Sequence, residues 1–185
     1  MKIPFSQISR DFLALQGESP DLLPVLEEGE ESPVLLLADE LRVRILDAAV
    51  KATLATPPLF LDEIKSVAAV PLFEDGGAII LRMPSDYLKL YSLRMSDWKE
   101  TVMATEPSGS LRAALGANAP RWMICAKRPM VTEQRDSSGI FLRILGSRSE
   151  RAAIELYYIP LPSFDGDILT ISKSAYHTML SFLVG

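Results

Sequence analysis

The chain has 185 residues, of which 48% are hydrophobic and 23% are charged, and its formal net charge is −5. This length suffices for one compact domain, or for a helical part and a β part that share a core. A single cysteine excludes a disulfide framework within the chain, and a single histidine leaves almost no material for a zinc site. The mean hydropathy of +0.17 is high for a small soluble protein, which points to an apolar surface that a partner covers.

The charges are unevenly spread. Residues 1–50 contain ten acidic and four basic side chains, whereas residues 121–152 contain seven basic and three acidic ones. An acidic end and a basic middle suit head-to-tail contacts between identical copies, although a solvated surface explains the same counts. We propose Arg128, Arg135 and Arg148 as contacts to an acidic neighbour, with solvated loops as the alternative.

The N-terminal segment predicts a short amphipathic helix followed by an acidic connector. Apolar residues recur at helical spacing at Phe5, Ile8, Phe12 and Leu15. The helix should end before Gly17. Residues 18–32 hold six acidic and no basic side chains, so they form either an extended linker or an arm that docks on a basic neighbour. We therefore take residues 1–32 as a helix with a connector arm and residues 33–185 as the main domain.

A long helix follows. Ser32-Pro33 supplies an N-cap residue and a proline for the first turn, and Pro57-Pro58 ends the helix because a residue before proline avoids the α region. One apolar stripe comprises Leu37, Leu41, Ile45, Ala48 and Ala52. A second stripe, on the opposite side, comprises Val43, Leu46, Val50 and Leu54. Because a helix with two apolar faces must be covered twice, we propose the second stripe for packing between subunits; the alternative is that it faces the sheet of its own chain.

Beyond this helix the pattern changes to short strands. The expected strands are Ala78–Met83, Tyr87–Met95, Thr101–Thr105, Trp122–Ala126, Ile140–Leu145 and Ala152–Ile159. Asp136-Ser137-Ser138-Gly139 resembles a hairpin tip within an exposed loop over residues 128–139, and Ser110–Leu115 is a candidate helical turn. A closing helix from about Thr170 to Leu183 places apolar residues on one face, at Ile168, Ile171, Ala175, Met179 and Phe182. The sequence thus predicts an α+β fold in which a long central helix and a C-terminal helix pack with a small antiparallel sheet or barrel.

The sequence offers few side chains that could act as a catalytic nucleophile or base. His177 is predicted to be exposed on the closing helix, and Cys125 lies in an apolar run typical of a buried thiol. A nucleophilic pair of these two residues is a remaining alternative, although neither lies in a recognisable nucleophile turn. No Walker or dinucleotide fingerprint and no cluster of metal ligands is present, so we expect no catalytic site, cofactor or metal. The apolar runs are far shorter than the ~20 residues that span a bilayer, and the N-terminal segment does not resemble a signal peptide. We therefore expect a soluble intracellular chain that does not contact a membrane.

Two short tracts carry a resemblance. Residues 80–90 read Ile-Leu-Arg-Met-Pro-Ser-Asp-Tyr-Leu-Lys-Leu, and residues 155–162 contain Tyr158-Ile159-Pro160 ahead of a closing helix. This order, with the long helix before it, resembles the head-to-tail connector proteins of tailed bacteriophages, of the adaptor, ring or tail-tubular type. Residues 93–98 resemble phage-derived proteins of the same layout. The likeness covers about residues 36–185 by layout, and the acidic segment 18–32 has no counterpart in it.

The resemblance implies a non-enzymatic structural protein of the virion, made in the host cytoplasm. Such a protein assembles with copies of itself as a ring at the portal-tail junction, contacts the portal and neighbouring tail proteins, and meets duplex DNA in the lumen only by proximity. Alternatives are a minor tail or tail-completion protein, a small host-encoded assembly factor, a nucleic-acid module built on the basic region, or a small Cys/His enzyme. An acidic chain argues against strong binding driven by phosphates.

Overall fold

The chain forms two compact units. The computed structural model describes residues 1–17, 33–67, 72–75, 78–106, 130–145 and 154–184. Unit 1 comprises Met1–Glu63 and Leu161–Gly185, and unit 2 comprises Ile64–Pro160, so unit 2 is inserted within the sequence of unit 1. The division expected from the sequence, into residues 1–32 and 33–185, stays a prediction.

The described residues contain helices and short antiparallel strands, so the mixed α+β class predicted from the sequence is confirmed. The helical elements are α1 (Phe5–Gln16), α2 (Pro33–Ala55), the 3-10 helix η2 (Pro58–Phe60) and α4 (Lys173–Val184). The strands are β1 (Lys2–Pro4), β2 (Lys65–Val67), β3 (Leu72–Asp75), β4 (Ala78–Arg82), β5 (Tyr87–Met95), β6 (Met130–Asp136), β7 (Gly139–Leu145), β8 (Ile154–Pro160), β9 (Ser163–Asp165) and β10 (Ile168–Thr170).

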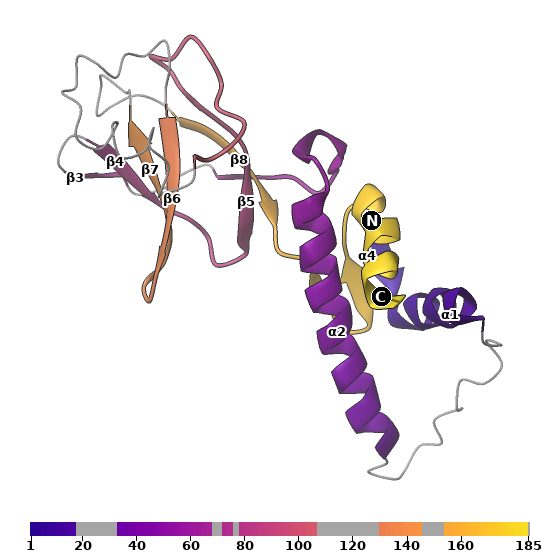
Figure 1. Ribbon diagram of the computed structural model, residues 1–185. Helices are drawn as coiled ribbons and strands as arrows, with labels where there is room; N and C mark the ends of the chain where they lie inside the picture. The colour runs from indigo at the N-terminus through magenta and orange to yellow at the C-terminus, as the bar shows by residue number, and fades with distance from the viewer. Residues whose placement is uncertain (18–32, 68–71, 76–77, 107–129, 146–153, 185) are drawn as a thin grey trace. The chain divides into compact units, whose positions relative to one another are not determined.

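In unit 1, α2 packs along α4 (Figure 1). The helix α1 ends where predicted, because Gly17 adopts a left-handed conformation with φ of 77° and its N–H bonds to Ala14. A small antiparallel sheet in the order β1-β10-β9 buries Ile3 and Leu169, which pair directly. The N-terminal strand therefore pairs with the strand that directly precedes the C-terminal helix.

Arg42 connects three elements of unit 1. Its guanidinium lies over the rings of Phe5 and Phe164, 4.9 and 5.4 Å from the two centroids. It also donates a hydrogen bond to the carbonyl of Gly166 at 3.1 Å and pairs with Asp167. Two ring faces and two acceptors on one planar cation fix α2 against α1 and the β9–β10 hairpin.

Unit 2 contains two antiparallel sheets, in the orders β2-β8-β5 and β3-β4-β7-β6. Each sheet turns one face toward a common core. Alternation along β7 illustrates this, because Leu142 and Ile144 are buried at 0% and 1% exposure while Arg143 between them is only half-buried. The β6–β7 hairpin ends at the predicted tip, where Asp136 accepts hydrogen bonds from the backbone and side chain of Ser138.

Strand β5 has the predicted bounds but not a regular alternation. Register shifts occur between Tyr87 and Lys89 and between Leu90 and Ser92. As a result Tyr87, Leu90 and Leu93 all belong to the core of unit 2, although strict alternation would put Leu90 on the opposite face from the other two. The bulges thus bring more apolar side chains of β5 to the core than a regular strand of this sequence could.

Two strand predictions need correction. Residues 101–105 form no strand: Val102 makes a single bridge to Leu93, and its neighbours do not continue the ladder. Residues 130–136, expected within an exposed loop, form β6 instead. Its first three residues are buried, whereas its charged second half is held by pairing with β7. The predicted strand over 122–126 and the turn over 110–115 lie outside the described residues.

The closing helix begins later than predicted, at Lys173, and two members of the predicted apolar stripe are accessible. Ile168 belongs to β10 and is 41% exposed, and Phe182 is 47% exposed, whereas Ala175 and Met179 of the same stripe are buried. The buried face of α4 also includes Tyr176, Leu180 and Leu183. Tyr176 is buried there, and its hydroxyl finds an acceptor in the carboxylate of Asp11 on α1.

Candidate interaction surface

No group of three metal-ligating side chains occurs among the residues that the structure describes. His177 is exposed on α4, with its ring 5.9 Å from that of Tyr176, and Cys125 lies outside the described residues. A helix long and apolar enough to cross a membrane is likewise not found in this part of the chain. The candidate site described next consists of accessible side chains on α2 and η2.

The helix α2 has one face fully inside unit 1. Ile45, Ala49 and Ala52 are exposed by at most 1%, and Ala48 by 3%. Three alanines at helical spacing allow α4 to approach closely, since short side chains keep the two backbones near each other. Thr53 is buried as well, and its hydroxyl donates to the carbonyl of Ala49 one turn earlier.

The second stripe of α2 faces away from that core. Val43 is 67% exposed and Leu54 is 51% exposed, while Leu46 and Val50 between them are half-buried. Beside this stripe lies a charged flank, in which Asp47 and Lys51 form an ion pair at 2.6 Å. The proposed interface residues thus lie on one accessible strip of helix, as the periodicity predicts; their role between subunits stays a prediction.

An exposed apolar pair follows α2. Leu59 and Phe60 in η2 are 73% and 67% exposed, as accessible as Val43 or more so. The backbone beneath them is held firmly: the Ser174 hydroxyl donates to the carbonyl of Phe60, and the N–H groups of Asp62 and Glu63 donate to the Ser172 hydroxyl at 3.0 and 3.1 Å. Sequence reasoning missed this pair, although two large apolar residues directly after Pro57-Pro58 were a usable signal.

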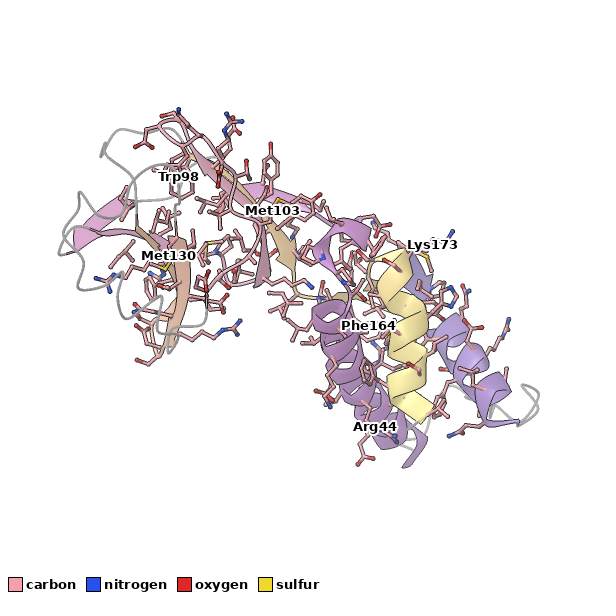
Figure 2. All side chains as sticks on the ribbon, turned by 45° about the horizontal axis from the view of Figure 1, so that its top comes forward. Arg44, Trp98, Met103, Met130, Phe164 and Lys173 are labelled. Carbon is pink, nitrogen blue, oxygen red and sulfur yellow. The ribbon has the colours of Figure 1, made fainter. Side chains whose placement is uncertain are left out.

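Asp62 links this segment to α4. Its carboxylate accepts a hydrogen bond from the backbone N–H of Lys173. Lys173, labelled in Figure 2, is the first residue of α4. The hydrogen bond with Ser172 lowers the pKa of Asp62, against the smaller raising effect of burial. The two apolar side chains of η2 are therefore presented on a rigid support.

The tracts that carry the phage resemblance meet in unit 2. Tyr87 pairs with Pro160 in the β5–β8 ladder, and the rings of Tyr87 and Tyr158 lie 5.9 Å apart. Asp86 accepts hydrogen bonds from the Tyr158 hydroxyl at 2.9 Å and from the Lys65 ammonium at 2.5 Å. Aspartate, tyrosine and proline in these tracts thus build one structural cluster.

Burial and hydrogen bonding shift the pKa values of the side chains in this cluster. Burial raises the pKa of Asp86, but the hydrogen bonds from Lys65 and Tyr158 outweigh it and hold the pKa below its usual value. Burial, with the bond to Asp86, raises the pKa of Tyr158 to about 12. The pKa of Tyr87 is also raised, mainly by burial and further by Glu133. The carboxylate of Glu133 accepts a hydrogen bond from the Tyr87 hydroxyl at 3.0 Å. These shifts leave each group in its ordinary protonation state at neutral pH.

Of the three basic residues proposed for contacts, only Arg135 is described. It is exposed, donates to Glu133 at 2.7 Å and reaches the carbonyl of Leu88 at 3.4 Å. Its guanidinium is therefore partly used within unit 2 to support the carboxylate that binds Tyr87. Arg128 and Arg148 lie outside the described residues.

A scan against models of protein families finds no match for this chain, and a search of curated proteins finds none either.

Proposed function

We propose that this chain is a non-enzymatic structural protein of a tailed-bacteriophage particle. In this proposal it assembles as a ring of identical copies at the junction between portal and tail, with neighbouring tail proteins below it and duplex DNA passing through the lumen without specific contacts. The assembled ring places the protein in the virion.

The observation that carries the proposal is the accessible apolar stripe of α2. Val43 and Leu54 are more than half exposed on a helix whose other face is buried at 0–3%. Exposing such side chains is unfavourable by roughly 25 cal/mol per Å² of apolar surface, so a contact that covers them is favoured. Leu59 and Phe60 extend the accessible apolar surface just beyond the end of α2.

A ring requires two different surfaces on each copy, since heterologous contacts repeat around a closed circle. The chain offers a marked contrast: unit 1 contains fourteen acidic and six basic side chains, whereas unit 2 contains ten acidic and thirteen basic ones. Opposite net charges on two parts of one chain favour head-to-tail association of copies. A connector that avoids gripping DNA also fits an acidic chain.

The cluster of Asp86, Tyr87 and Tyr158 supports the proposal in a second way. The residues that resemble the phage family are joined by side-chain contacts across 72 residues of sequence, as between Asp86 and Tyr158. A motif held by packing and hydrogen bonds is typical of a structural protein, because it stabilises a fold and leaves no group with a catalytic pKa.

The test is assembly with the portal protein encoded in the same genome. Purified chain and portal are mixed and examined by native mass spectrometry and negative-stain electron microscopy. We expect a ring of this chain on one end of the portal, weakened by Val43→Asp and unaffected by Glu40→Asp, an exposed position on the charged flank. A chain that ignores the portal and binds only tail proteins would instead indicate a minor tail or tail-completion protein.

A further inference from the structure

The accessible stripe of α2 has the spacing of a helix that packs against another helix. Its members follow one another at intervals of three, four and four residues, from Val43 through Leu46 and Val50 to Leu54. Intervals of three and four place side chains along the seam between two helices. The chain's own α4 lies against the opposite, alanine-rich face, as the burial of Ala48 and Ala52 shows.

The order of residues along the stripe suits a second copy in the opposite direction. With a two-fold axis beside α2 midway between residues 48 and 49, Val43 lies opposite Leu54 of the second copy. Leu46 then lies opposite Val50 of the second copy to within one residue, which is about 1.5 Å along a helix. Every apolar member of the stripe thus meets another apolar member.

The charged flank obeys the same axis. In an antiparallel pair of identical helices, one flank faces the same flank of its partner. The axis defined by the apolar residues brings Asp47 opposite Lys51 of the second copy, again to within about 1.5 Å. Within one chain Asp47 and Lys51 already pair with each other at 2.6 Å, and both stay accessible, at 62% and 60%, so the two-fold axis brings two such pairs of opposite charges together. Apolar and charged positions therefore agree on one register.

From this agreement we propose that two copies of the chain pair through α2 in solution, antiparallel, with the stripe at the centre and two Asp47–Lys51 contacts beside it. The pair is isologous and closed, whereas a ring is built from heterologous contacts. Because the stripe of each paired chain is covered by the other copy, pairing would prevent the copies from assembling into a ring until the portal is present. The pairing itself does not depend on the assignment to a phage particle.

The experiment is sedimentation velocity of the full chain over a concentration series at low salt. We expect a reversible monomer–dimer equilibrium. Val50→Ser should raise the dissociation constant about a hundred-fold, because each pair loses two buried valines. Asp47→Lys and Lys51→Asp should each raise it roughly ten-fold, since attraction becomes repulsion at both symmetric contacts. A chain that stays monomeric, or that forms only larger assemblies, overturns the proposal.

A mixing experiment separates this register from general charge attraction. Asp47→Lys and Lys51→Asp copies, mixed in equal amounts, should give heterodimer well above the half expected from random pairing, as read by native mass spectrometry. The matched control mixes Glu40→Lys with Arg44→Asp, which creates the same two net charges at positions of the flank that face no charge in this register. We expect no heterodimer excess in the control; an equal excess in both mixtures rejects the two-fold arrangement.

The outcome for pairing and the outcome for the proposed function are independent readouts. Pairing is measured on the free chain, and the connector role on the mixture with portal. A dimer that never binds the portal would support the two-fold pair and reject the connector role. A ring formed from a strictly monomeric chain would support the connector role and reject the two-fold pair.

Discussion

Asp86 is expected to be a main support of unit 2. Its carboxylate accepts hydrogen bonds from the Tyr158 hydroxyl and the Lys65 ammonium, and Tyr158 is only 4% exposed. In Asp86→Ala the buried hydroxyl loses its acceptor, which costs about 1–3 kcal/mol. Loss of the Lys65 pair adds little, about 0.5 kcal/mol or less, because the two side chains are 55% and 36% exposed. We therefore expect Asp86→Ala to lower the free energy of unfolding by roughly 2–3 kcal/mol.

The effect is measured by urea unfolding followed through tryptophan fluorescence. Both tryptophans of the chain lie in unit 2, and Trp98 is 3% exposed, so the signal reports this unit. The control is Ser85→Ala, an exposed neighbour in the same turn. Tyr158→Phe removes the hydroxyl together with its need for an acceptor and should cost about 1 kcal/mol.

The double variant makes the test decisive. Because both single substitutions remove the same hydrogen bond, Asp86→Ala combined with Tyr158→Phe should cost less than the sum of the two. The lowered pKa of Asp86 also predicts a pH dependence. The stabilisation from Asp86 is complete above the ordinary carboxyl pKa and is lost as the pH falls through the lowered pKa of the folded chain. If Asp86→Ala unfolds at the same urea concentration as Ser85→Ala, the cluster does not stabilise unit 2. If the two single costs add, the Asp86–Tyr158 hydrogen bond is not what stabilises it.

Two further predictions follow from other parts of the structure. Arg42→Lys should lower the thermal midpoint of unit 1 by a few degrees, a loss of about 1 kcal/mol in the free energy of unfolding. The reason is that an ammonium cannot lie flat over the rings of Phe5 and Phe164 while it donates to the carbonyl of Gly166. Circular dichroism measures the midpoint, and an unchanged midpoint contradicts the prediction. The ultraviolet titration of Tyr158, taken as the difference between the parent chain and Tyr158→Phe, should be centred near pH 12. Since this pKa is raised, the stabilisation from Tyr158 is complete below about pH 10 and lost as the pH rises toward 12; a midpoint near 10 contradicts the burial of the hydroxyl.

The elements that sequence reasoning located correctly have strong periodicity and clear ends. The helix α2 begins at Pro33 and ends just before Pro57-Pro58, and its two apolar stripes follow directly from about 100° of rotation per residue. Strand β5 was bounded correctly because Pro84-Ser85-Asp86 breaks the chain before an apolar run. Its bulges were not predictable, since they depend on pairing with β8, which is distant in sequence.

The errors share a physical cause, which is that tertiary contacts overrode local patterns. The charged residues Glu133 to Asp136 suggested a loop, yet β7 pairs with all of them. Three-residue strands such as β9 and β10 are too short to show any period. Within the candidate site, the stripe of α2 was readable from spacing alone. The Asp86 cluster was not, because its members come together only through the sheet.

Coverage of α2 by neighbouring copies is the central claim, and cysteine labelling at position 43 tests it most directly. Val43→Cys and Ser6→Cys, both at exposed positions, are treated with maleimide as dilute free chains and again as portal-bound rings, and peptide mass spectrometry reads each site. The account predicts that position 43 reacts in the free chain and is strongly protected in the ring, whereas position 6 reacts in both. Equal reactivity of position 43 in the two states would contradict it.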